Sequence, residues 1–267
     1  QAMDEAEYFD FVKSGAADEE SFDQEYQCIP ADDDAKFLEY GLITACEYSG
    51  GTDWQRSLQG PFQGRLFAGV DIGRKKDLTV LWVVEQLGDV FYTRHVEVME
   101  KMRKSAQEAI LWPWFAICDR ICIDATGLGI GWSDDAQDKF GKNRVEAVNF
   151  SGPVKEALAY PLKGAMEDRQ VRIPEDPKIR ADLRKIQKTT TSAGNVRFVA
   201  DGDDSTKVNG HADRFWALAL ALHAGSNPAA PLDWTPAPSL PRGFDNHGAE
   251  GEQDEDYLRL IEPRASW

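Results

Sequence analysis

Three aspartates stand at the ends of apolar segments, where an uncompensated carboxylate is costly. Asp71 follows the apolar run 66–70, Asp124 follows the run 121–123, and Asp213 lies in the first turn of an apolar helix over about 211–222. Burying a carboxylate is unfavourable unless a cation compensates its charge. If the three ends converge, their oxygens form the kind of site that Mg²⁺ or Mn²⁺ prefers. We therefore predict a metal site here, which indicates metal-dependent phosphodiester chemistry.

The net charge of −16 is concentrated at the two ends of the chain. Residues 1–60 hold 15 acidic and 3 basic side chains, and residues 226–267 hold 8 and 3. Residues 61–225 hold 23 acidic and 24 basic side chains. Because acidic flanks are commonly solubilising or partner-binding segments, we expect three parts: an acidic linker at 1–60, a domain at 61–225, and a Pro-, Gly- and acid-rich tail at 226–267. The overall charge therefore does not exclude a DNA substrate.

The sequence contains neither a membrane-spanning stretch nor a C-x-x-C motif. No uninterrupted apolar stretch approaches the ~18 residues of a membrane-spanning helix, so we expect no membrane partner. The four cysteines form no C-x-x-C pair. Cys118 and Cys122 flank and occupy an expected strand, and we interpret them as small core residues in a reducing compartment.

The order of elements in 61–225 predicts an α/β fold with a mixed central sheet. Three strand-like runs, 66–72, 78–85 and 90–98, are separated by short turns, which favours an antiparallel meander. A helix at 105–116 then leads to a strand at 120–124, which favours a parallel neighbour reached by a crossover. The remaining expected elements are a helix opening at the glycines 127–129 and ending near 140, a strand at 145–150, helices at 154–169 and 176–188, a β-hairpin within 189–199, and a helix starting near 210–211.

Each of the three aspartates also has a simpler interpretation. Asp71 could start a turn, Asp124 could cap the following helix, and Asp213 could be stabilised by the helix dipole alone. However, all three acids stand at element ends in an order that suits one fold. A shared site explains this better than three unrelated local roles.

Neighbouring polar residues are alternative or auxiliary members of that site. Asp77 could cap the turn after Asp71 or assist it. Asp203 and Asp204 compete with Asp213 for the third position. His211 is a candidate auxiliary ligand or proton carrier, although a histidine at a helix start is equally often exposed.

Basic residues at 180–188 are candidate DNA contacts. On one helix, Arg180, Arg184 and Lys188 would form an i, i+4 row with Lys185 beside it. Such a row suits the phosphate backbone, and a solvated helix face is the alternative.

The strings at 69–79 (GVDIGRKKDLT), 123–129 (IDATGLG) and 211–221 (HADRFWALALA) together resemble the nuclease domain of phage terminase large subunits, in particular the Mu-like prophage branch. Residues 21–28 are similar to the segment that closes the ATPase domain of those proteins. The resemblance implies an RNase H-like mixed central sheet, an antiparallel meander plus parallel strands, flanked by helices and carrying an extra β-hairpin. It also implies that Asp71, Asp124 and Asp213 are the catalytic metal triad.

The same resemblance implies a function and partners. The domain would be an endonuclease that cleaves double-stranded viral DNA during genome packaging, with two Mg²⁺ or Mn²⁺ ions, in the cytoplasm of the bacterial host. An ATPase motor domain, the portal and the small terminase subunit would be its partners. This sequence contains no Walker-type G-x-x-x-x-G-K-[ST] motif, so residues 1–60 would follow a missing ATPase domain.

The residues are also compatible with three other functions. Another RNase H-like enzyme, a resolvase or transposase, would use the same acids. An actin-like or sugar-kinase-like phosphotransferase also places Asp-x-Gly at strand ends, as in Asp71-Ile72-Gly73, but needs two lobes to enclose ATP. A non-enzymatic scaffold with acidic docking arms is the third.

Overall fold

The computed structural model describes residues 4, 7–9, 11, 36–48, 54–73, 78–127, 129–190, 196–200 and 212–226. Four candidate site residues, Asp77, Asp203, Asp204 and His211, lie outside the described residues. No helix among those described is long and apolar enough to cross a membrane.

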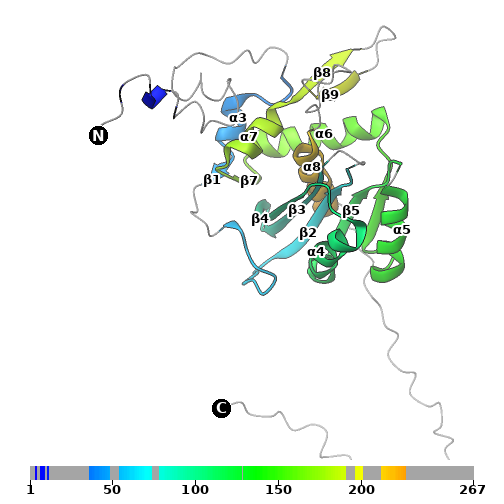
Figure 1. Cartoon of the computed structure of the whole chain (residues 1–267). Helices are drawn as coiled ribbons and strands as arrows, with labels where there is room; N and C mark the ends of the chain where they lie inside the picture. The colour runs from blue at the N-terminus through cyan, green and yellow to red at the C-terminus, as the bar shows by residue number, and fades with distance from the viewer. Residues whose placement is uncertain are drawn as a thin grey trace, which may run out of the picture. The chain divides into compact units, whose positions relative to one another are not determined.

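A seven-stranded mixed sheet forms the centre of the fold (Figure 1). Its strands are β1 (Glu47–Tyr48), β2 (Arg65–Asp71), β3 (Thr79–Leu87), β4 (Val90–Met99), β5 (Arg120–Asp124), β6 (Val145–Val148) and β7 (Val171–Pro174). Their order across the sheet is β1-β7-β4-β3-β2-β5-β6. Strands β2, β3 and β4 form the expected antiparallel meander, and β5 pairs parallel to β2 as expected. Strand β6 continues the parallel half beside β5.

Helices cover both faces of this sheet. They are α3 (Tyr40–Thr44), α4 (Lys104–Ile117), α5 (Gly129–Phe140), α6 (Gly152–Glu167), α7 (Pro177–Arg184) and α8 (Asp213–Ser226). The buried side chains of α6, α7 and α8 belong to one apolar cluster, and those of α4 and α5 belong to a second cluster on the other face. Helix α8 lies against β2, β3 and β5, at the middle of the sheet (Figure 1).

The expected extra hairpin is also present. Strands β8 (Ile186–Thr190) and β9 (Val196–Ala200) pair antiparallel as a separate two-stranded sheet (Figure 1). Phe198 of β9 packs edge-on against Phe37 and Trp216, which attaches the hairpin to the α8 side of the core.

The folded part extends further towards the N-terminus than the predicted boundary at residue 61. Residues 36–48 form α3 and β1, and β1 pairs parallel to β7, which had not been predicted as a strand. Phe37, Leu38 and Ile43 are buried in the core. The acidic composition of 1–60, averaged over the whole segment, hid this short apolar stretch.

The helix predicted at 176–188 is shorter than expected. Asp176 caps α7 by accepting the N–H groups of Lys178 and Ile179 at 2.7 and 3.3 Å, and the helix ends at Arg184. From Ile186 the chain pairs as β8 instead. The β-branched residues Ile186, Thr189 and Thr190 favour a strand, which explains the early end.

Candidate active site

The alternation of side chains directs two of the predicted acids to the same face of the sheet. In β2, Phe67 packs in the α8-side cluster, whereas Val70 packs in the α4-side cluster. Successive side chains of a strand point to opposite faces, so Asp71 shares the face of Phe67. In β5, Cys122 belongs to the α8-side cluster, so Asp124 also points to that face. Because β2 and β5 are parallel neighbours, their terminal carboxylates lie at the same edge.

Asp213 joins these two carboxylates from α8. Asp71, Asp124 and Asp213 are 8, 7 and 8% exposed, respectively. The pKa of Asp71 is raised well above its ordinary value, because the carboxyl is buried and because the negative charges of Asp213 and Asp124 act on it. The structure therefore brings together the three acids that the sequence singled out.

A close contact between α8 and β2 determines where Asp213 lies. A Cβ atom on Gly69 would lie 2.1 Å from the carbonyl oxygen of Ala217 and 2.3 Å from the backbone nitrogen of Ala221. Only glycine allows the two backbones to approach so closely. Since Gly69 lies two residues before Asp71 and Ala217 lies one helical turn after Asp213, this contact brings the two carboxylates level.

The turn after β5 fixes Asp124. The backbone N–H of Thr126 donates to Asp124 Oδ1 at 2.8 Å. A Cβ atom on Gly129 would lie 1.8 Å from the carbonyl oxygen of Asp124, so α5 begins directly over the end of the strand. The helix-capping interpretation of Asp124 is thus replaced by a local turn that holds its carboxyl group on the site.

A fourth acid, Asp182 of α7, supports the start of α8. Asp182 Oδ2 accepts the backbone N–H of Arg214 at 3.0 Å and lies 3.6 Å from Arg214 Nη1, while Oδ1 lies 2.8 Å from Lys185 Nζ. A carboxylate at a helix N-terminus satisfies an N–H group that has no partner within the helix. Asp182 also raises the pKa of Asp71. The sequence does not reveal this role, because the partner Arg214 is 32 residues away.

Lys155 of α6 is a cation beside the acids. Its charge opposes the rise in the pKa of Asp71. The ammonium group lies over two aromatic rings, 4.9 Å from the centroid of Trp216 and 5.5 Å from that of Phe150. These cation–π contacts position the side chain. No sequence pattern marks this residue, because Lys155 lies in an ordinary amphipathic helix.

The predicted basic row at 180–188 does not form. Arg180 and Arg184 are 5 and 3% exposed, and Lys188 lies on β8 rather than on the helix. Arg180 makes a bidentate ion pair with Glu47, with Nε–Oε1 and Nη2–Oε2 distances of 2.8 and 2.9 Å. The guanidinium groups of both arginines also lie over the ring of Tyr40. Their positions indicate that they hold α7 to α3 and β1.

The triad residues suit a divalent cation. Three buried carboxylates from three elements offer hard oxygen ligands, and their charges act unfavourably on one another. A bound dication would relieve that repulsion far more effectively than a single lysine. The donor set therefore fits Mg²⁺ or Mn²⁺.

Comparison with known proteins identifies the same part of the chain. Residues 68–224 match the family model of the terminase RNase H-like domain. The Mu-like prophage FluMu protein gp28 of Haemophilus influenzae is 26% identical over 193 residues, which are 70% of this chain and 36% of that protein. The chain thus spans little more than a third of the length of this relative.

Solved structures of terminase nucleases are also similar to this chain. The large terminase nuclease of the thermophilic phage G20c with bound magnesium is 27% identical, with a TM-score of 0.51, over 61% of this chain and 82% of that one. The same nuclease with bound cobalt is 25% identical, with a TM-score of 0.50, over 61% and 83%. The expected RNase H-like sheet and the expected resemblance to terminase nuclease domains are confirmed. This chain belongs to the terminase RNase H-like domain family.

Proposed function

We propose that this chain is a metal-dependent endonuclease that cleaves double-stranded viral DNA during genome packaging, in the cytoplasm of the bacterial host. The observation that supports this most strongly is the gathering of Asp71, Asp124 and Asp213 at one edge of the sheet, where burial and the charges of the other two acids raise the pKa of Asp71. A bound divalent cation would compensate these charges and make the arrangement favourable. The similarity to a large terminase nuclease with bound magnesium supports the same assignment.

The three acids would divide the metal ligation between them. Asp71 ends β2, which is flanked by β5 in the sheet and covered by α8. Because these two elements carry Asp124 and Asp213, the three carboxylates together would hold the ions. When bound, the ions would supply an activated water and would stabilise the leaving 3′ oxygen of the phosphodiester.

Lys155 would act on the substrate rather than on the ions. Its ammonium group is close enough to Asp71 to affect the carboxyl pKa, and Trp216 and Phe150 hold it in place. A fixed cation at this edge can pair with a phosphate oxygen next to the cleaved bond. It would thereby orient the DNA backbone over the carboxylates.

Contacts with DNA would be mainly to phosphates, with little sequence preference. Lys188 is exposed on the hairpin and Lys185 is partly exposed beside it, so these two lysines remain candidates for phosphate contacts. We leave Arg180 and Arg184 out of this proposal, because both are buried. An ATPase motor domain, the portal and the small terminase subunit are the proposed partners of the whole protein.

Cleavage of supercoiled plasmid with Mn²⁺ tests this proposal. The wild-type chain should nick and linearise the plasmid, and Asp71→Asn should reduce the rate at least ~100-fold, equivalent to about 2.7 kcal/mol of transition-state stabilisation. Asp134→Asn, an exposed acid on α5, is the matched control and should cleave normally. Undiminished cleavage by Asp71→Asn would remove Asp71 from catalysis, and ATP turnover without cleavage would favour a phosphotransferase.

A further inference from the structure

A second group of metal-binding side chains lies on the α8 face of the sheet, away from the three aspartates. Cys122 of β5, Glu146 of β6 and His223 of α8 each offer one ligand atom, and these atoms all lie within 4.8 Å of one another. His223 Nε2 is 3.3 Å from Glu146 Oε1, and Cys122 Sγ is 3.6 Å from Glu146 Oε2. Three separate elements thus converge on one point.

This cluster is distinct from the proposed catalytic site. His223 lies ten residues after Asp213 on the same helix, which corresponds to about 15 Å along the helix axis. Cys122 lies two residues before Asp124 on β5 and is fully buried, while His223 and Glu146 are 36 and 35% exposed. The cluster is therefore closed on the thiol side and open to solvent on the imidazole and carboxylate side.

The carboxylate of Glu146 is prepared for a cation. Arg120 Nη2 contacts Oε2, which leaves Oε1 directed towards His223. A neighbouring group that holds one carboxylate oxygen commonly orients the other towards a metal.

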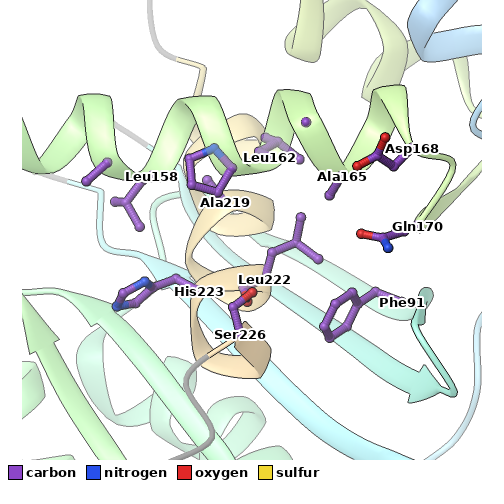
Figure 2. A pocket seen from close by; sticks show the side chains of 13 residues that line it. Phe91, Leu158, Leu162, Ala165, Asp168, Gln170, Ala219, Leu222, His223 and Ser226 are labelled. Atoms are coloured by element: carbon purple, nitrogen blue, oxygen red, sulfur yellow. The ribbon is translucent and has the colours of Figure 1, made fainter.

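One residue of the cluster, His223, also lines a cavity beside α8. A space of about 360 Å³ lies between α6 and the C-terminal half of α8, and His223 is one of its lining residues together with Phe91, Leu162 and Ser226. Figure 2 shows the imidazole extending from α8 on the side opposite Phe91. Solvent and small ligands can therefore approach the imidazole, and the remaining coordination position would take water.

We propose that Cys122, Glu146 and His223 bind a Zn²⁺ ion that ties the C-terminal half of α8 to β5 and β6. Thiolate, imidazole and carboxylate are the ligands that zinc takes in proteins, commonly three of them with water in the fourth position. Binding would displace the thiol proton, which passes to solvent. Because α8 also carries Asp213 and β5 ends in Asp124, the ion would help to hold these two acids in register.

Co²⁺ substitution provides a direct test, because thiolate-bound Co²⁺ gives a near-ultraviolet charge-transfer band that carboxylate-bound Co²⁺ does not. The full chain, stripped with a chelator, should develop this band with one equivalent of Co²⁺, and Zn²⁺ should abolish it. Cys122→Ser and His223→Gln should each lose the band. Absence of the band in the wild type, or its persistence in Cys122→Ser, would overturn the proposal.

Two further variants make the result specific. Cys118→Ser removes a buried thiol on the opposite face of the sheet and should retain the band. Asp71→Asn should also retain it, so the outcome is independent of whether the aspartates catalyse DNA cleavage. Circular dichroism checks that each variant is folded. If Cys122→Ser is unfolded, His223→Gln decides alone, because that side chain is partly exposed.

Discussion

Gly69 of β2 and Ala217 of α8 touch backbone to backbone, and a single added carbon on Gly69 would lie 2.1 Å from the Ala217 carbonyl oxygen. From this contact, Asp71 lies two strand residues onward, about 6.6 Å. Asp213 lies four helical residues back, about 6 Å. The two distances are similar, so the carboxylates of Asp71 and Asp213 lie about equally far from the contact, side by side. A glycine that contributes no side chain thus sets the geometry of the candidate site.

Replacing Gly69 should therefore damage both stability and the site. Gly69→Ala must push α8 away from the sheet, and we expect a loss of at least ~2 kcal/mol in the free energy of unfolding. A displacement of about 1 Å at the acids should also lower cleavage about 100-fold. Urea unfolding and plasmid cleavage measure the two effects. Gly131→Ala is the control, since a Cβ there meets nothing within 4 Å. Equal stability of the two variants would show that the contact is not tight.

Removing Asp182 should loosen the start of α8. Asp182→Ala leaves the Arg214 N–H and the two cationic side chains without their carboxylate, and we expect destabilisation of about 1–3 kcal/mol. Hydrogen exchange should show faster exchange in the first turn of α8, with Asp182→Asn intermediate because its amide oxygen still accepts. Unchanged exchange at Arg214 would contradict the capping role.

Glu85 should make the free energy of unfolding depend on pH in the acidic range. Burial alone would raise its pKa, but the N–H groups of Gly64 and Gln63 and the Arg94 side chain bind the carboxylate and lower the pKa below its ordinary value. The unfolded chain therefore takes up the proton first, so this stabilisation is present above about pH 4.5 and is lost as the pH falls through the folded pKa. Glu85→Gln should cost about 1.5–3 kcal/mol at pH 7.

The difference between Glu85→Gln and wild type should shrink as the pH is lowered towards 3, as measured by urea unfolding at several pH values. Glu100→Gln, whose side chain is 57% exposed, should show no such trend. A constant difference for Glu85→Gln across this range would show that its charge does not stabilise the fold.

The central strands and the three acids could be predicted from sequence because local patterns specify them. The strand at 120–124 is observed at Arg120–Asp124, since an apolar run ended by an acid leaves little choice of boundaries. The short strands β1 and β7 escaped prediction. Two to four residues carry too little periodicity, and these strands form because β7 pairs with β4 and β1 pairs with β7.

Polar contacts between distant segments also could not be predicted from the sequence. Arg180 is an ordinary exposed helix residue by pattern, yet Glu47, 133 residues away, makes it a buried ion pair. Lys155 and the cluster of Cys122, Glu146 and His223 likewise depend on packing between elements that the sequence does not order in space. Asp213, by contrast, could be predicted because a charge in an apolar helix is conspicuous on its own.

Diffraction from crystals of this chain soaked in Mn²⁺ tests the central claim most directly, because anomalous scattering locates the ions without any assumption about activity. We predict one or two anomalous peaks in contact with the carboxylates of Asp71, Asp124 and Asp213, and no peak there in Asp71→Asn crystals soaked in the same way. Mn²⁺ density elsewhere, with these three carboxylates free of metal in the wild type, would contradict the account.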